Sequence, residues 1–499
     1  MATDDLRDWL RRVDEIGELT RVRGADPVDD VGGLTDLYQW EMGNPALLFD
    51  DLAGYPAGFR VLSNVLTSLR RVAITLDLPP DSPQAMVQAL RQKITSLKPI
   101  PPSVQTTGPV LENVFTGSEV DVTRFPAPLW HPQDGGRYLG TGDLVIMRDP
   151  DSGWTNAGTY RVQVHDEQTL GIYISAGKHG RLIRDKYWAR GEACPVAISF
   201  GHNPLLLIIG GLEVDYGTDE FAVAGGMRGE ALPVVKAPLT GLPVPASAEI
   251  VIEGEIPPDE QVAEGPFGEW AGYYASGQKP APIVRVRSVL HRNDPIVLGC
   301  LPGKPPNDNT YFRSPMRAAF VWNELERAGV PGITGVWSHE AGGGRMFNVV
   351  SIKQLYPGHA KQVGMATASC HAGSYANRYV VVVDEDIDPS DTNEVIWALC
   401  TRTDVSRDID IMRRAWSTGL DPMAYQGGGG GQGYFNDRMI IDACRPYDRR
   451  ETFPAVARIT PDEAAEVRSR WTELFTPDGG VAREVRTASA SGSAGGGKE

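Results

Sequence analysis

Residues 155–161 read Thr-Asn-Ala-Gly-Thr-Tyr-Arg and place an amide oxygen and a guanidinium close together on a segment rich in Thr, Tyr and Val. Further along, residues 263–269 read Ala-Glu-Gly-Pro-Phe-Gly-Glu and carry two carboxylates on either side of a turn sequence. A fixed cation beside two carboxylates in different surroundings is an arrangement for proton transfer, because the environment can push the two pKa values apart. Together the two stretches predict an enzyme.

The turn between Glu264 and Glu269 decides whether the two carboxylates can meet. In an unbroken strand, residues five positions apart point to opposite faces. The intervening Gly-Pro-Phe-Gly (265–268) instead predicts a tight bend that brings both side chains toward one cavity. One glutamate paired with Arg161 would stay ionised, and the other, in an apolar pocket, could exchange a proton near neutral pH. An acidic surface turn is the alternative, and the aromatic residues at 270, 273 and 274 favour the cavity.

On both sides of these stretches, the chain divides into regions of different texture. Its 499 residues exceed what one core usually supports, so two or three domains are expected. The first region, residues 1–109, is predicted to be α/β and contains a Pro-rich linker at 98–102. Its expected elements are a helix at 4–22, strands at 46–50 and 60–62, and a helix at 82–97.

The region 110–305 is rich in short β-prone runs, which predict a barrel or sandwich more than a doubly wound sheet. Strands are expected at 144–147, 158–164, 170–174, 196–200, 205–209 and 250–252, with one helix near 219–224.

The region 306–486 is predicted to be α/β. Helices are expected at 316–328, 359–368, 393–401 and 461–475, and strands at 332–336, 347–352 and 379–383. The glycine run at 427–433 predicts a mobile loop, and residues 487–499 predict a disordered tail.

Composition and charge exclude several classes of protein. A net charge of −16 argues against a surface for nucleic acid or for an anionic membrane. No apolar run is long enough to span a bilayer, since the best candidate, 195–214, is interrupted by His202, Asn203 and Pro204. The N-terminus lacks an apolar signal region, and the five cysteines are scattered without paired spacing. These features predict reduced thiols and a cytoplasmic location.

A mixed set of polar residues is a candidate metal site. Asn156, His179 and Glu220 offer an amide oxygen, an imidazole and a carboxylate, which suit manganese or magnesium better than zinc. Spacing alone does not separate this from three unrelated polar residues at strand ends and in loops.

Further motifs bear on a cofactor. Residues 178–181 (Lys-His-Gly-Arg) with Arg184 could hold a phosphate or form a solvated charged face. Gly210-Gly211 could let the backbone approach a cofactor or form a simple turn. The glycine run lacks the Lys-Ser/Thr of a phosphate loop, and no Gly-x-Ser-x-Gly supports a Ser/His/Asp triad.

At these residues the chain resembles the UbiD-type decarboxylases, which use prenylated flavin mononucleotide (FMN). The resemblance covers nearly the whole length, and several matched blocks in the family's order make it specific. The blocks are Pro126–Trp130, Asp134–Tyr138, Asn156–Arg161, Glu264–Glu269 with Gly272–Tyr274, and Pro357–Ala360. The resemblance implies an α+β fold: a central split β-barrel, similar to that of flavin reductases, flanked by an N-terminal α/β region and a C-terminal α/β domain.

The resemblance also implies roles for matching residues. The family's catalytic Arg-Glu-Glu set falls on Arg161, Glu264 and Glu269. Its metal ligands fall on Asn156, His179 and Glu220, where a manganese ion would bridge to the cofactor phosphate; potassium is a further implied ion. The positions expected to contact the cofactor are these three ligands with Arg161, Thr159, Tyr160, Tyr173, Ile174, Ser175 and Lys178.

The implied reaction is the reversible, non-oxidative decarboxylation of an aromatic or heteroaromatic acid, such as a pyrrole, furan, indole or phenazine carboxylate. Loss of carbon dioxide from an aromatic carbon leaves electron density with no stable place, and an electron-poor cofactor supplies the sink. Arg161 is expected to orient the substrate carboxylate and steady Glu264, and Glu269 to deliver the proton that replaces carbon dioxide.

Other functions remain open from sequence. They are a polyprenyl-hydroxybenzoate or cinnamic-type acid decarboxylase, a flavin reductase, and a non-catalytic flavin-binding protein, which would not need the proton-transfer set. Within 305–313, Asn307, Asn309 and Arg313 could bond a substrate or anchor the loop. The resemblance implies a flavin prenyltransferase as cofactor supplier, and a homodimer or homohexamer formed through the C-terminal domain.

Overall fold

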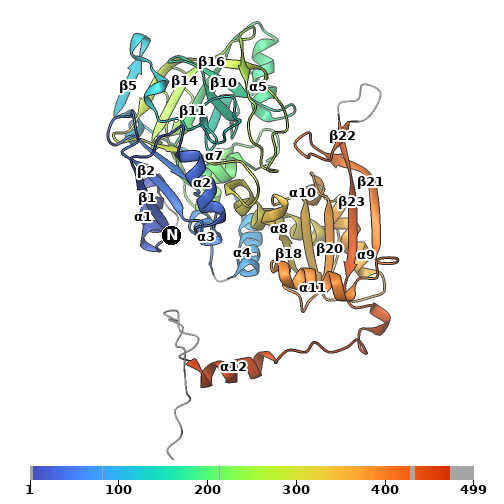
Figure 1. Cartoon of the computed structure of the whole chain (residues 1–499). Coiled ribbons are helices and arrows are strands. Elements are labelled where there is room, and N and C mark those ends of the chain that lie inside the picture. The colour runs from blue at the N-terminus through green and yellow to red at the C-terminus, as the bar shows by residue number, and fades with distance from the viewer. Residues whose placement is uncertain (1–3, 81, 213, 427–432, 473–499) are drawn as a thin grey trace, which may run out of the picture. The chain divides into compact units, whose positions relative to one another are not determined.

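The computed structural model describes residues 4–80, 82–212, 214–426 and 433–472 (Figure 1). The chain forms two compact units, residues 1–447 and 448–499. In the second unit the helix α12 (Pro461–Arg470) begins at a capping box made by Thr460 and Glu463. It is shorter than the predicted 461–475. Residues 473–475, residues 427–432 of the loop predicted at 427–433, and the predicted tail at 487–499 lie outside the described residues.

The N-terminal region is a four-stranded sheet with helices against it. In sheet order the strands are β1 (Leu19–Arg23), β2 (Ala46–Asp50), β3 (Arg60–Ser63) and β17 (Ile296–Leu298). The helices are α1 (Leu6–Glu15), α2 (Val31–Trp40), α3 (Leu69–Leu76) and α4 (Pro83–Ser96). Because β17 follows the whole barrel in sequence, this sheet is completed only after the barrel segment has been traversed.

Helix α1 is shorter than the helix predicted at 4–22. Asp5 caps its first turn by accepting a hydrogen bond from the amide of Asp8, and Trp9 and Val13 are fully buried. Gly17, with φ of +72°, then turns the chain, and the next residues pair with β2 as a parallel strand. The prediction was wrong beyond Glu15 because the apolar spacing continues through a glycine that ends the helix.

The central region is a ten-stranded, curled antiparallel sheet, which confirms the predicted split barrel. Its main path is β6 (Tyr138–Gly140), β9 (Arg161–Val164), β10 (Thr169–Tyr173), β16 (Lys279–His291), β14 (Ile250–Ile256), β11 (Cys194–Phe200), β7 (Leu144–Arg148) and β8 (Thr155–Gly158). Two further strands, β5 (Asn113–Thr116) and β15 (Gln261–Glu264), pair with β16. The barrel segment also contains helices α5 (His179–Trp188), α6 (Pro204–Gly210) and α7 (Glu220–Arg228), and a small sheet of β13 (Pro243–Pro245), β12 (Pro233–Lys236) and β4 (Ser103–Gln105).

The sequence of connections requires this sheet to curl. Strand β8 lies at one end of the sheet order and β9 next to the other end, yet only Thr159 and Tyr160 separate them. A link of this length spans roughly 10 Å. The two ends of the sheet must therefore approach each other. The single strand predicted at 158–164 is in fact divided: Gly158 ends β8, and residues 161–164 form β9 near the opposite end of the sheet.

The run Leu205–Ile209, predicted as a strand, is the helix α6. Asn203 caps it by accepting a hydrogen bond from the amide of Leu205 at 2.9 Å, and Pro204 occupies its first turn. Every residue from Pro204 to Ile209 is buried, so the run has no polar face to reveal a helical period. The helix predicted near 219–224 is confirmed as α7, which Asp219 caps.

The C-terminal region is a six-stranded mixed sheet with helices packed on it. In sheet order the strands are β18 (Ile333–Ser338), β19 (Phe347–Ile352), β20 (Tyr379–Asp384), β23 (Tyr434–Ala443) and β21 (Ile409–Ser417), with β22 (Tyr425–Gln426) paired to β23. The helices are α8 (Asp308–Arg327), α9 (His359–Ser369), α10 (His371–Ser374) and α11 (Thr392–Arg402). The predicted α/β character is confirmed, but α8 starts before the predicted 316, because Asn307 caps it and Pro315 is accommodated inside it.

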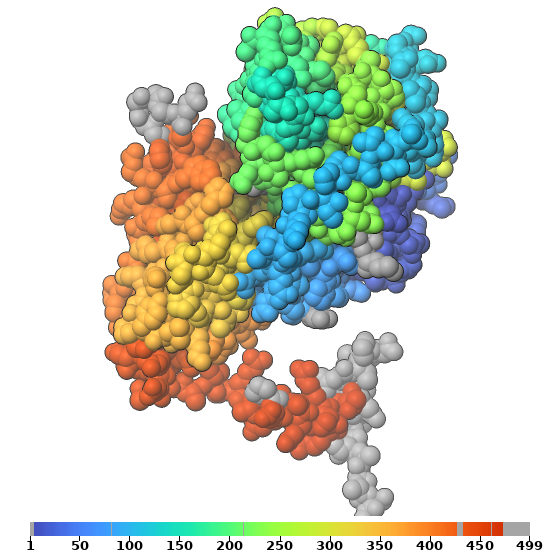
Figure 2. Space-filling view, turned by 180° about the vertical axis from the view of Figure 1, so that it is seen from behind, coloured from blue at the N-terminus to red at the C-terminus, as the bar shows by residue number. Residues whose placement is uncertain are grey.

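Helix α8 joins the regions of the first unit. Figure 2 shows the blue α4 segment beside the yellow α8 segment, and Arg91 Nε donates to Asn323 Oδ1 at 2.9 Å between them. One buried apolar cluster contains residues from α1, the barrel, α8 and β20. In the described ranges, no helix is both long enough and apolar enough to cross a membrane.

Candidate active site

Arg161, the first residue of β9, lies between the two glutamates. Its Nε and Nη2 donate to Glu264 Oε1 and Oε2, each at 2.7 Å, and its Nη1 donates to Glu269 Oε1 at 2.9 Å. Glu264 ends β15 and Glu269 lies in the loop that follows. The structure therefore brings the three predicted catalytic residues together, and the acidic surface turn considered from sequence is excluded.

A second loop holds the bend between the glutamates in place. Gly265 has φ of +78°, which favours glycine, and Gly135 N donates to Pro266 O at 2.8 Å. Gly268 N donates to Asp134 Oδ1 at 3.2 Å. A Cβ added at Gly135 would overlap the carbonyl of Gly265. The close approach of these two backbones explains glycine at position 135.

The two glutamates have different surroundings. The side chain of Glu264 is 0% exposed and also accepts a hydrogen bond from Tyr138 Oη at 3.0 Å, whereas that of Glu269 is 18% exposed. Burial raises the pKa of Glu269 to about 7, and the nearby charge of Glu264 acts in the same direction, against Arg161 and Lys279. Glu269 can therefore carry a proton at neutral pH and release it.

Aromatic rings enclose the guanidinium of Arg161. Its Cζ lies 4.5 Å from the ring centroid of Tyr173 in β10 and 5.3 Å from that of Phe267 in the bend. The ammonium of Lys279 lies 5.0 Å from the Tyr173 ring centroid. These contacts fix the orientation of Arg161 and keep water from two of its sides.

Asn156 and Glu220, two of the predicted metal ligands, are in direct contact. Asn156 Nδ2 donates to Glu220 Oε1 at 2.6 Å, and Ala157 N donates to Glu220 Oε2 at 3.0 Å. Burial raises the pKa of Glu220 to about 7. Asn156 Oδ1 is buried and has no hydrogen-bond partner among the described residues. An orphaned amide oxygen beside a buried carboxylate fits a cation that both would bind.

His179, the third predicted ligand, is the first residue of α5. It packs edge-on against Trp154 and Tyr216, with 5.4 Å between ring centroids in each case. Among the described residues, no hydrogen bond joins it to Asn156 or Glu220, and no group of three or more His, Cys, Asp and Glu side chains is arranged to hold a metal. Of the three predicted ligands, only His179 and Glu220 are residues of these four types, so a three-ligand metal site would also need the amide oxygen of Asn156.

The residues predicted to contact the cofactor come from three neighbouring segments. Tyr160 Oη accepts a hydrogen bond from Gly180 N at 3.2 Å, and burial raises the pKa of Tyr160 to about 12. Thr159 Oγ1 is buried without a partner in the described part of the chain. Tyr173 is the last residue of β10, and Ile174, which follows it, is buried. Ser175 is half-buried, and Lys178 is exposed at the N-cap position of α5. A helix N-terminus with a lysine favours an anion.

Two arginines of the predicted basic cluster, Arg181 and Arg184, contact neighbouring side chains of α5. Arg184 pairs with Asp185 at 2.6 Å, and Arg181 lies 3.8 Å from the same carboxylate. Arg184 also packs on Trp188, with 4.0 Å from its Cζ to the ring centroid. Both arginines thus contact side chains of α5 itself.

The segment 305–313, a candidate substrate-facing loop, is anchored by structural contacts. Asn307 is fully buried and its Nδ2 donates to Gly303 O at 2.7 Å. Asn309 Nδ2 lies 3.2 Å from Cys300 Sγ, and Arg313 Nη1 donates to Gly211 O at 2.9 Å. Of the two readings open from sequence, the contacts favour anchoring. Gly211 likewise caps α6, as a turn.

Tyr138 and Lys279 belong to the site but were not predicted as functional. Tyr138 reaches Glu264 because β6 pairs with β9, and Lys279 lies opposite Glu264 in the β15–β16 register. An acidic and a basic residue placed opposite one another in a hairpin can indicate, from sequence, that the two side chains are in contact. The long connection from Glu264 to Lys279 hides it, because hairpin rules set the register only for short loops.

Three models of one family match the chain in consecutive segments. They are the N-terminal domain (residues 10–90), the Rift-related domain (residues 103–305) and the C-terminal domain (residues 310–443) described as UbiD, 3-octaprenyl-4-hydroxybenzoate carboxy-lyase.

Similar proteins of known name match over nearly the same length. A phenolic acid decarboxylase of Streptomyces sp. (strain D7) is 32% identical over 485 residues, which cover 95% of this chain and 99% of the relative. A pyrrole-2-carboxylic acid decarboxylase of Pseudomonas aeruginosa is 32% identical over 415 residues, covering 80% and 83%. An evolved dimeric form of the UbiD-class enzyme HmfF from Pelotomaculum thermopropionicum, solved with prenylated FMN, superimposes with a TM-score of 0.78 at 28% identity, covering 92% of this chain and 98% of that one.

Proposed function

Because the chain belongs to the UbiD family of carboxy-lyases, we propose that it decarboxylates a small aromatic or heteroaromatic carboxylic acid, reversibly and without net oxidation, with prenylated FMN as cofactor. The observation that carries the proposal is one guanidinium, that of Arg161, bonded to two glutamates in different surroundings. The relatives named for phenolic acid and pyrrole-2-carboxylic acid support the substrate class, and the relative solved with prenylated FMN supports the cofactor.

Residues of the barrel would hold the cofactor. Asn156, Glu220 and His179 would bind a manganese ion beside the cofactor phosphate, and the orphaned Asn156 Oδ1 supports this. Lys178 at the start of α5 would meet the phosphate, while Thr159, Tyr160, Tyr173, Ile174 and Ser175 would line the flavin. We assign no side chain to a potassium ion. When bound, prenylated FMN supplies an electron-poor centre for the electron density that departing carbon dioxide leaves behind.

Arg161 would bind the substrate carboxylate. A guanidinium has five N–H donors, and three of those on Arg161 are directed at the glutamates, which leaves two for a substrate. The rings of Tyr173 and Phe267 hold the guanidinium so that these donors point in a fixed direction. Pre-organisation of this kind lowers the entropic barrier to reaction.

Glu269 would deliver the proton. In decarboxylation the bond from the ring carbon to the carboxylate breaks, carbon dioxide leaves, and the same carbon forms a C–H bond with the proton from Glu269. The Glu269 carboxylate then regains a proton from water at its exposed edge. Glu264 is fully enclosed and accepts three hydrogen bonds, so it serves to orient Arg161.

The wider setting forms part of the proposal. A flavin prenyltransferase would supply the cofactor, and the enzyme would act as a homodimer or homohexamer through its C-terminal region; one relative is known in an evolved dimeric form. All five cysteines are free thiols, which supports a cytoplasmic location.

The test uses the full chain coexpressed with a flavin prenyltransferase. The absorption spectrum and cofactor mass would be recorded, and loss of carboxylate followed across benzoic, phenolic, cinnamic, polyprenyl-hydroxybenzoic, pyrrole, furan, indole and phenazine acids. We expect bound prenylated FMN and turnover of one ring class. Turnover confined to a cinnamic or polyprenyl-hydroxybenzoic acid would replace the substrate class. Absence of modified flavin under anaerobic conditions with manganese, or nicotinamide-dependent flavin reduction without carbon dioxide release, would overturn the proposal.

A further inference from the structure

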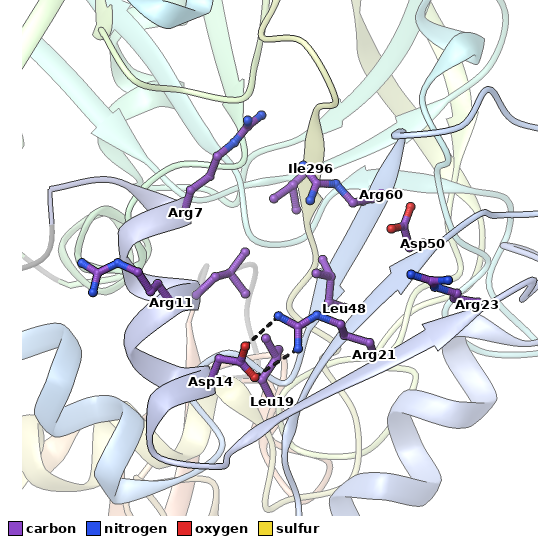
Figure 3. A pocket seen from close by; sticks show the side chains of 11 residues that line it. Arg7, Arg11, Asp14, Leu19, Arg21, Arg23, Leu48, Asp50, Arg60 and Ile296 are labelled. Carbon is purple, nitrogen blue, oxygen red and sulfur yellow. Dashed lines mark hydrogen bonds and ion pairs between the residues drawn. The ribbon is translucent and has the colours of Figure 1, made fainter.

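A cavity of about 380 Å³ lies in the N-terminal region, between α1 and the four-stranded sheet (Figure 3). No residue that lines it belongs to the active site. Helix α1 contributes Arg7, Leu10, Arg11 and Asp14, the sheet strands contribute Leu19, Arg21, Arg23, Leu48, Asp50 and Arg60, and β17 contributes Ile296. The register places Arg21 opposite Leu48, Arg23 opposite Asp50, and Arg60 opposite Ile296.

Basic side chains dominate this lining, although the whole chain has a net charge of −16. Five arginines stand against two aspartates. Arg21 forms a two-point ion pair with Asp14, at 2.8 and 3.0 Å, as Figure 3 shows. Arg7 forms a similar pair with the buried Glu249, at 2.8 and 2.9 Å. The positive charge of these two arginines is therefore compensated within the chain.

The charge of Arg60 is not compensated in this way. Among the described residues, no carboxylate lies within ion-pairing distance of it, and its Nε is buried without a hydrogen-bond partner. Its Nη2 donates to the carbonyl of Asp294 at 2.5 Å, and Arg7 Nη2 donates to the same oxygen at 3.1 Å. Burial, together with the like charge of Arg7, lowers the pKa of Arg60, against the longer-range charges of Glu249, Asp50 and Asp294. Two cations thus converge on one neutral acceptor, and an anion beside Arg60 would stabilise both.

Part of the cavity wall is apolar. Leu10 and Leu48 are 7% and 6% exposed and Leu19 is half-buried, whereas Ile296, beside the Arg60 guanidinium in Figure 3, is fully buried. A bare inorganic ion would leave this surface in contact with water. A ligand that carries an apolar body would cover it.

We propose that this cavity is a second binding site, for a small organic oxyanion whose carboxylate or phosphate binds Arg60 and whose compact apolar body packs on Leu10, Leu19 and Leu48. Guanidinium groups bind both oxyanions in the same two-point manner. The cavity is within the range of about 300 to 1,000 Å³ that small-molecule sites occupy. Arg23 at the rim, 3.9 Å from Asp51 and largely exposed, can turn toward the bound anion.

Fluorine NMR on the full chain tests the proposal. The probes are 4-fluorobenzoate and 4-fluorophenyl phosphate, which share one body and differ in the anion, with inorganic phosphate as competitor. In Arg60→Gln we expect one binding event to weaken about tenfold or more, since it loses a charged hydrogen-bond donor. Binding of the aryl acid at the active site would persist in every variant, so failure of the proposed function would not affect this result.

Arg148→Gln is the matched control. Arg148 also donates from Nη2 to a backbone carbonyl, that of Gly241 at 3.1 Å, but lies at the end of β7 outside the cavity. The Arg148→Gln variant should bind both probes with the affinity of the unaltered chain. If Arg60→Gln does not fold, Arg60→Lys keeps the charge without the two-point geometry and should lose part of the affinity. Unchanged affinity in a folded Arg60 variant would overturn the proposal. An affinity for inorganic phosphate, measured by competition, that equals the affinity for 4-fluorophenyl phosphate would also overturn it.

Discussion

Access to water separates the two glutamates that share Arg161. The carboxyl of Glu269 reaches solvent along one side, whereas that of Glu264 is enclosed by Arg161 and Tyr138. A group that gives up a proton in every turnover must recover one, so it needs a path to water. A group that orients a guanidinium is better without one, because water would compete for its hydrogen bonds. The same residue type therefore has two uses a few residues apart.

Replacing Glu269 with glutamine tests the proton-donor role. Glutamine keeps an oxygen for Arg161 Nη1, but its amide is not an acid, so we expect turnover to fall by at least about a thousandfold. Binding of prenylated FMN, measured by absorption, should be unchanged. Normal turnover in this variant would contradict the assignment.

The pH profile gives the same test in the unaltered enzyme. Because the pKa of Glu269 is raised to about 7, its protonated form predominates below that pH and declines above it. The decarboxylation kcat/KM should therefore fall about tenfold per pH unit above roughly pH 8. The Glu269→Asp variant should turn over more slowly, but its kcat/KM should show the same decline at high pH.

The grouping of Arg161, Glu264 and Glu269 was predictable from sequence, whereas the contacts of Tyr138 and Lys279 with this group were not. The Gly-Pro-Phe-Gly bend limits where Glu264 and Glu269 can point, which is local information. Tyr138 and Lys279 reach Glu264 through strand pairings that join distant segments. No local pattern records those pairings.

Two loops act together as one element of the site. The loop at 134–137 packs on the bend at 265–268 through a backbone hydrogen bond from Gly135 to Pro266 and a hydrogen bond from Gly268 N to the Asp134 carboxylate, so the position of Glu269 depends on both segments. Two secondary-structure elements were predicted wrongly because their conformation depends on contacts with segments that are distant in sequence. Leu205–Ile209 is apolar throughout, and only burial on all sides by the surrounding fold makes it a helix. Arg161 begins a new strand because the sheet closes at Tyr160, a property of the barrel rather than of the segment.

Gly135→Ala tests the coupling of these loops. The added Cβ would overlap the carbonyl of Gly265 and must displace the bend that carries Glu269. We expect kcat to fall at least about tenfold, since a shift of about 1 Å at a reacting group has effects of that size or larger. The control is Gly277→Ala, where a Cβ meets no atom within 4 Å and φ is not in the left-handed region. Equal activity of the two variants would show that the loops are independent.

At the scale of the molecule, the first unit behaves as one folded body because helix α8 contacts each of its regions. Asp308 Oδ1, in the first turn of α8, accepts a hydrogen bond from Leu66 N at 2.5 Å, and Arg313 binds the end of α6. The sequence predicted three regions of different texture from local composition. It did not predict that α8 would link them, because the segment's own pattern shows only a helix. The contacts suggest that a charge buried at this junction affects the stability of the whole unit.

Asp308→Asn tests this at the junction. Burial raises the pKa of Asp308 to about 7, above its unfolded value, so the folded state holds a proton more tightly than the unfolded state. The stabilisation is complete below about pH 4 and is lost as pH rises through about 7, on the order of 4 kcal/mol in all. Asparagine does not titrate and can still accept from Leu66 N. Its free energy of unfolding, from urea titrations, should therefore decline less steeply between about pH 5 and pH 7.5, by up to about 1.4 kcal/mol per pH unit. Asp259→Asn, at an exposed position, should keep the slope of the unaltered chain. Identical slopes in all three proteins would mean that Asp308 is already ionised in the folded state across this range, and that Arg71 nearby, rather than protonation, compensates its burial.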